Sequence, residues 1–160
     1  MGLVMDLVAG DSREILLAVA VDDLASFADR SRFPAHLAFG GAVDPTWLDL
    51  FSQAARAVTG RDDPVDFFEA RSELDGPGGD GGDAGERSVE RVDPGWITAV
   101  AMIDDRDLDA ITGRWIDLLE EELGELPREE KPTIRLFARQ ILDFARVADR
   151  APAVILAWSL

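Results

Sequence analysis

The sequence contains no cysteine, no tyrosine and no asparagine, and its only histidine is His36. The lack of cysteine excludes disulfides, thiolate zinc sites, iron-sulfur clusters and cysteine nucleophiles. With one histidine and no tyrosine, few side chains remain that can activate a nucleophile or move protons near neutral pH. We therefore expect no cofactor, and a function that depends on shape and carboxylates.

Basic residues are also scarce: 16 lysines and arginines stand against 32 aspartates and glutamates, which gives a formal net charge of −16. This charge repels phosphate backbones and anionic bilayers. The sequence has no apolar run of membrane-spanning length, and it begins without the basic region and cleavage site of a signal peptide. We expect a soluble cytoplasmic protein that binds neither nucleic acid nor membranes. Codon bias, adaptation to high salt and a basic partner each explain the acidity.

The pattern of apolar residues predicts a single α+β domain over residues 1–160, with amphipathic helices packed on one mixed or antiparallel sheet. Helices are predicted over 45–58, 107–123 and 133–150, where apolar residues repeat at helical spacing. Apolar runs predict strands over 3–8, 96–103 and 154–158, the last one central in the sheet. Residues 14–21 fit either a capped helix or a buried strand.

The middle of the chain has a different composition. Residues 75–86 contain six glycines, three aspartates and one proline, and such a segment buries too little apolar surface to offset the entropy of ordering. We predict a flexible Gly/Asp-rich loop over residues 73–90 within the domain. An EF-hand frame starting at Asp75 fails, because its third residue is Pro77 and its sixth is Asp80 instead of glycine.

Gly10, Asp11 and Ser12 follow the first predicted strand and resemble the nucleophile block of the GDSL-type lipases and esterases. In that family a C-terminal Asp-x-x-His supplies the base and an asparagine stabilises the oxyanion. This sequence has no asparagine and no histidine after His36, so Ser12 lacks a base. We interpret the three residues as a polar turn or helix cap. His36 has no carboxylate or second histidine beside it in the sequence, and we interpret it as a structural residue.

Acidic residues crowd the C-terminal end of the helix predicted over 107–123, where the helix dipole favours cations. They are Glu120, Glu121, Glu122 and Glu125. A base from another element, a bound cation or fraying of the helix each accounts for them. Glu122 and Glu125 are therefore candidate metal ligands.

Arginines form a stripe on the helix predicted over 133–150. Arg135, Arg139, Arg146 and Arg150 fall within an arc of roughly 60°, opposite the apolar face. Like charges four residues apart repel, so the stripe does not stabilise the helix by itself. These arginines are candidate partner-binding residues, and a solvated face partly neutralised by neighbouring aspartates is the alternative.

The order of elements over most of the chain, together with six residues, resembles the YfbM-like family of small uncharacterised bacterial proteins. The six residues are Met1, Gly2, Asp44, Trp47, Thr59 and Gly60. The spacing from Trp47 to Thr59 and the glycine loop depart from that family's pattern. The resemblance implies an α+β fold and carries no activity, because the family has none assigned.

Two functions remain open from the sequence. The first is a non-catalytic binding or protein-interaction module, for instance an acidic protein that blocks or carries something basic. The alternative is a carboxylate-based, divalent-metal-dependent hydrolase that uses Glu122, Glu125 and either Asp104 or Asp105. The lack of a nucleophile and base pair favours the first. Partner, substrate and oligomeric state do not follow from the sequence.

Overall fold

The computed structural model describes residues 4–40, 43–74 and 87–159, without the side chain of Arg87. These residues form an α+β domain with a five-stranded sheet in the order β2-β1-β5-β4-β3, in which every neighbouring pair is antiparallel. The strands are β1 (Val4–Gly10), β2 (Ala35–Phe39), β3 (Arg71–Glu73), β4 (Arg87–Val92) and β5 (Ala153–Ser159). The predicted fold class is confirmed, and the sheet is antiparallel.

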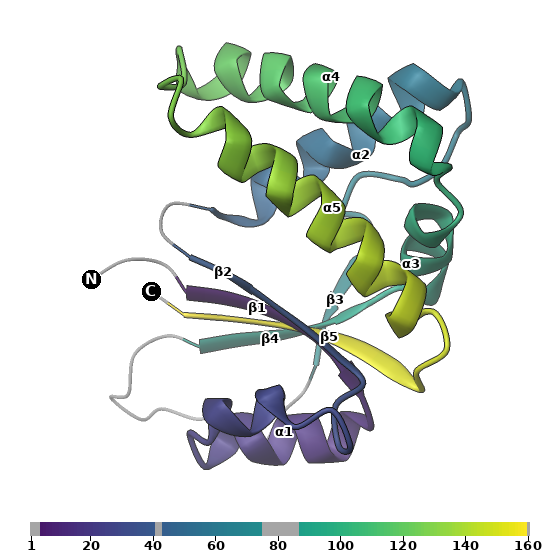
Figure 1. The fold of residues 1–160 in the computed structure, drawn as a ribbon. Coiled ribbons are helices and arrows are strands. Elements are labelled where there is room, and N and C mark those ends of the chain that lie inside the picture. The colour runs from purple at the N-terminus through teal and green to yellow at the C-terminus, as the bar shows by residue number, and fades with distance from the viewer. Residues whose placement is uncertain (1–3, 41–42, 75–86, 160) are drawn as a thin grey trace.

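Helices cover both faces of the sheet (Figure 1). One face carries α1 (Ser12–Ala20) and the short 3-10 helix η1 (Leu24–Ala28). The other lies under four helices: α2 (Pro45–Thr59), α3 (Pro94–Ala101), α4 (Asp105–Leu123) and α5 (Lys131–Ala148). The larger hydrophobic core lies on the four-helix side, and a smaller one lies beneath α1.

Alternation along the strands divides residues between the two cores. In β1, Met5 and Leu7 contribute to the larger core, whereas Val8 points to the smaller one. The same alternation in β5 places Leu156 in the larger core and Ile155 under α1. Because β5 lies between β1 and β4 and is buried on both faces, the prediction of a central strand over 154–158 is confirmed.

The segment 14–21, which fits either a helix or a buried strand by sequence, is helical. Its N-cap accounts for this outcome. The Asp11 carboxylate accepts hydrogen bonds from the backbone N–H groups of Arg13 (3.0 Å) and Glu14 (3.2 Å), which satisfies two of the unpaired donors in the first helical turn. The Gly10-Asp11-Ser12 segment therefore acts as a strand end and helix cap, as interpreted from the sequence.

The predicted strand over 96–103 is wrong, because this segment lies in and just after helix α3. Asp93 caps the helix by accepting the N–H of Gly95 at 2.8 Å, and Pro94 occupies the first turn. Trp96, Ile97 and Val100 are all buried. A helix enclosed by other elements is apolar around most of its circumference, so its hydrophobic run looks like that of a buried strand.

The predicted loop over 73–90 overlaps two strands. Glu73 ends β3, and residues 87–90 belong to β4, which pairs with both β3 and β5. Residues 75–86 lie outside the described residues. None of the helices within the described ranges is long and apolar enough to cross a membrane.

Candidate functional site

Asp6 is the only buried charged residue in the part of the chain that the structure describes, with 8% of its surface exposed. It lies on β1 and pairs with His36 on the neighbouring strand β2, where His36 Nε2 and Asp6 Oδ1 are 2.7 Å apart. A carboxylate removed from water is costly unless a hydrogen-bonding partner compensates it. The His36 ring supplies that partner, and it also packs 5.4 Å from the ring of Phe27.

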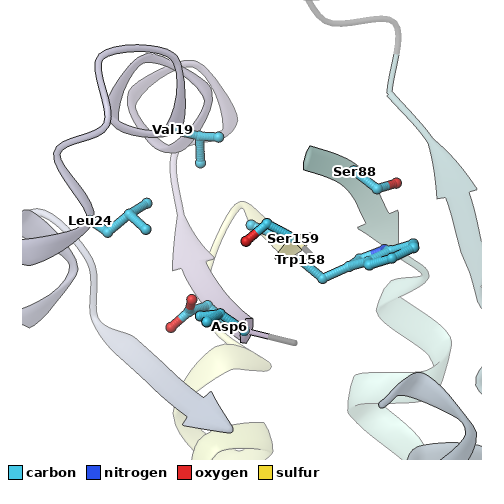
Figure 2. Close-up of a pocket in the computed structure, with 8 residues that line it drawn as sticks. Asp6, Val19, Leu24, Ser88, Trp158 and Ser159 are labelled. Atoms are coloured by element: carbon cyan, nitrogen blue, oxygen red, sulfur yellow. The ribbon is translucent and has the colours of Figure 1, made fainter. Parts of the chain in front are cut away.

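A hollow opens beside Asp6 on the sheet face that carries α1 (Figure 2). Its empty volume is about 280 Å³, including space open to solvent. Val19 of α1 and Leu24 of η1 lie along one side, and the Ser159 side chain points toward them from β5, whereas the side chains of Ser88 and Trp158 point away. Its lining residues are Val4, Asp6, Val19, Leu24, Ser88, Ala157, Trp158 and Ser159. The hollow therefore combines the Asp6 carboxylate and the Ser159 hydroxyl with apolar walls.

Sequence reasoning missed the pairing of His36, because Asp6 lies 30 residues away in the chain. The available signal was Asp6 itself, a charged residue inside an otherwise apolar strand. The structure shows no hydrogen bond between His36 and Ser12 among the described residues, and Ser12 begins α1 beyond the end of β1. The arrangement is a buried polar pair rather than a nucleophile with its base.

The acidic end of α4 has a basic neighbour on another element. Lys131, at the start of α5, places Nζ 3.2 Å from Glu120 Oε1. Glu122 and Glu125 are exposed. Across residues 4–40, 43–74 and 87–159, no three His, Cys, Asp or Glu side chains gather closely enough to hold a metal ion. The assignment of Glu122 and Glu125 as metal ligands stays a prediction.

Two arginines of the predicted stripe fasten α5 to the junction between α3 and α4. Arg139 Nη1 and Arg146 Nη1 each lie 3.0 Å from Asp105 Oδ1. Arg146 also donates from Nη2 to the carbonyl of Ile103 at 2.9 Å. The hydrogen bond from Arg146, followed by that from Arg139, lowers the pKa of the Asp105 carboxyl. These two residues therefore contact their own chain.

The other two arginines of the stripe, Arg135 and Arg150, are exposed. The structure shows no ion pair for either within its described ranges. Their role in binding a partner stays a prediction. Because Arg139 and Arg146 pair with Asp105, the four arginines do not form one continuous free surface.

A second feature, which sequence reasoning also missed, is the loop between α2 and β3. It contains two adjacent phenylalanines with opposite environments. Phe67 is fully buried, with its ring centroid 4.8 Å from that of Trp96, whereas Phe68 is 71% exposed. Single exposed apolar side chains are common on protein surfaces. Phe68 is distinguished by the hydrogen bonds that hold its backbone.

Hydrogen bonds from α2 hold the loop. The backbone N–H of Phe68 donates to Asp49 Oδ1 at 2.6 Å. The Arg56 guanidinium donates to the carbonyl of Pro64 at 2.7 Å and to Asp66 Oδ1 at 2.6 Å. The backbone is thus anchored at Phe68 itself and at Pro64 and Asp66 before it, and the exposed side chain projects from this anchored segment.

Arg71 supports the same ring from β3. Its guanidinium carbon lies 5.8 Å from the Phe68 ring centroid and 5.4 Å from that of Phe67. The charge of Arg71 is compensated internally, because Nη1 donates to Glu90 Oε2 at 2.9 Å. Trp158 Nε1 donates to the same oxygen at 3.0 Å.

In the segment 61–69, which carries Phe68, the exposed charges are mainly acidic. Asp62, Asp63 and Glu69 are exposed, and Arg61 is the exposed cation in the same segment. Val65 is a further exposed apolar residue. We call these residues the Phe68 surface: Asp62, Asp63, Val65, Phe68 and Glu69. It combines an exposed ring on anchored backbone with three exposed acidic residues of the same segment.

Asp49, which anchors Phe68, gives a testable dependence on pH. Burial raises the pKa of its carboxyl, although the Phe68 N–H and Arg71 oppose that effect. A raised folded-state pKa means that this group favours folding below its unfolded-state pKa and loses that contribution as the pH rises through the folded-state value. We expect Asp49→Asn, which keeps an acceptor for the Phe68 N–H, to be more stable than the unmodified chain at pH 7.

Urea unfolding of both proteins at pH 7 and below about pH 4, where carboxyls become protonated, checks this prediction. The stability gain of Asp49→Asn should shrink in acid. Asp109→Asn, at an exposed position of α4, is the matched control. An equal gain in stability at both pH values, or an equal gain in Asp109→Asn, contradicts a raised pKa of Asp49 as the cause.

Comparisons with protein-family models, with curated proteins and with solved structures found no match to this chain. The resemblance to the YfbM-like family therefore stays a prediction.

Proposed function

We propose that this protein is a protein-interaction module that binds a basic partner through the Phe68 surface. The observation that carries the proposal is the exposed ring of Phe68 on an anchored loop. Hot spots of protein interfaces are enriched in aromatic side chains and cluster near the centre of the interface, surrounded by residues that exclude water on binding. A side chain already held in place also loses less conformational entropy when the partner arrives.

The charge of the surface supports a partner of basic and apolar character. The segment that carries Phe68 also exposes Asp62, Asp63 and Glu69, and the chain as a whole has a formal net charge of −16. Complementary charge raises the rate of encounter and disfavours acidic partners, including a second copy of this chain. A partner segment in which an apolar side chain is flanked by lysine or arginine complements both the Phe68 ring and the acidic residues.

The test uses a photo-crosslinking amino acid placed at position 68 of the full chain in its native host. A matched chain carries the same group at position 136, because Leu136 is also an exposed apolar residue (57%) but lies on α5. We expect position 68 to capture a partner whose crosslinked segment is apolar and rich in lysine or arginine. Equal capture at the two positions, or an acidic crosslinked segment at position 68, contradicts the proposal.

Once a crosslinked segment is identified, its synthetic peptide provides the affinity test. Phe68→Ala should weaken binding at least about tenfold, as expected for a central aromatic residue of an interface, and Leu136→Ala should leave binding unchanged. Both variants should unfold at nearly the same denaturant concentration as the unmodified chain, because both side chains are mostly exposed. A binding loss that is equal in the two variants excludes the Phe68 surface as the contact.

A further inference from the structure

We propose that the hollow beside Asp6 binds a primary ammonium group carried on an aliphatic chain. This site lies on the sheet face that carries α1 and does not depend on the Phe68 surface. Asp6 places a carboxylate inside an apolar strand and at the edge of an opening to solvent.

The polar groups of the hollow leave one carboxylate oxygen available. His36 occupies Asp6 Oδ1, and no described residue donates a hydrogen bond to Oδ2. Ser159, which also lines the hollow, makes no described side-chain hydrogen bond (Figure 2). A carboxylate oxygen and a hydroxyl oxygen are acceptors for a group that carries several N–H donors.

The arrangement favours an ammonium over a guanidinium. A guanidinium binds carboxylates best through two parallel hydrogen bonds to both oxygens, and His36 already uses one of them. An ammonium is a compact charge with three donors and can bind a single oxygen together with a neighbouring hydroxyl. A metal ion needs more anionic ligands than the single carboxylate that lines this hollow.

The walls fit the methylene stem of such a ligand. Val4, Val19 and Leu24 line the hollow with aliphatic side chains. Long amines bury their methylene groups along apolar surface and keep the charged end at polar partners. The ligand is therefore an alkylammonium, either a free amine or the lysine side chain of another protein.

His36 makes the site directly observable, because its ring is the only imidazole in the chain. We would follow its ring resonances by NMR at fixed pH and ionic strength while adding n-butylammonium chloride. We expect a saturable shift, and no saturable shift with butan-1-ol or with sodium chloride at matched ionic strength. A linear, non-saturable change with butylammonium overturns the proposal.

Variants separate binding at Asp6 from general charge effects. Asp6→Asn should raise the dissociation constant at least about tenfold, because it removes the charge from a charge-assisted hydrogen bond, whereas the exposed control Asp109→Asn should leave it unchanged. Val4→Trp, at a half-exposed rim position, should fill the hollow and abolish the shift while Asp6 and His36 remain. If Asp6→Asn does not fold, Val4→Trp decides the matter: an unchanged shift in this variant overturns the proposal.

Short blocked peptides distinguish the two sources of the ammonium. Gly-Lys-Gly is compared with Gly-Arg-Gly and with a peptide that carries norleucine in place of lysine. Binding of the lysine peptide at least as tight as that of butylammonium assigns the site to a protein partner, and weaker binding assigns it to a free amine. Equal binding of the arginine and lysine peptides, or of the norleucine peptide, overturns the ammonium assignment.

Discussion

Replacing Trp115 by alanine is expected to lower the free energy of unfolding by about 3–5 kcal/mol, the cost of removing a large aromatic side chain from a packed core. Trp115 lies on α4 and is almost fully buried. Its ring meets those of Phe51 and Trp47 edge to face, at centroid distances of 5.2 and 6.3 Å. Its Nε1 donates to the carbonyl of Trp47 at 2.8 Å. The substitution therefore removes packing and a buried hydrogen bond between α4 and α2 together.

Urea unfolding followed by circular dichroism measures this loss. Trp115→Phe refills most of the space but leaves the Trp47 carbonyl without its donor, so we expect a smaller loss of about 1–3 kcal/mol. Leu136→Ala, on the exposed surface of α5, should change stability by less than about 0.5 kcal/mol. A loss below about 1 kcal/mol for Trp115→Ala contradicts the described packing of α4 on α2.

The second large effect is expected at the Asp6 and His36 pair. His36→Leu should lower the free energy of unfolding by about 3 kcal/mol, because it leaves a buried carboxylate without its partner. The two side chains are only 11% and 18% exposed, so solvent compensates little of that loss. The leucine fits the apolar surroundings that Phe27 provides, which separates the loss of the hydrogen bond from a loss of volume.

The double variant Asp6→Val/His36→Leu is the decisive control. Replacing both members of a buried pair by apolar residues of suitable shape is often neutral or stabilising. We therefore expect it to recover most of the stability lost in His36→Leu when both are unfolded in urea at pH 7. A double variant as unstable as the single one means that the pair contributes through packing alone.

The helices were predictable where a capping residue stood beside a periodic apolar pattern. Asp44 caps α2 by accepting the N–H of Thr46 at 2.8 Å, and Gly60 follows with a left-handed φ of 71°, and both signals are legible in the sequence. The same Asp-Pro signal at Asp93 and Pro94 also begins a helix. The apolar run that follows this signal predicts a strand when it is read alone, which is why the prediction over 96–103 is wrong.

The edge of the sheet and both sites depend on contacts between distant segments. Glu90 of β4 is charged, and its carboxylate accepts hydrogen bonds from Arg71 and Trp158, which lie 19 and 68 residues away in the chain. Hydrophobic periodicity does not reveal such pairs. Likewise, the sequence does not distinguish Phe67 from Phe68, because the buried ring packs against Trp96, which lies 29 residues further along the chain.

The placement of β5 has a consequence for how the chain folds during synthesis. Among the described strands, β1 and β4 are joined only through β5, and β1 pairs with it across roughly 150 residues of intervening chain. A ribosome that has made residues 1–152 has therefore synthesised the helices described above but not the strand that connects the two parts of the sheet. Pairing over such separations slows folding and leaves strand edges open in the meantime. The nascent chain thus has a window for chaperone binding or aggregation that closes only when residues 153–159 have left the exit tunnel.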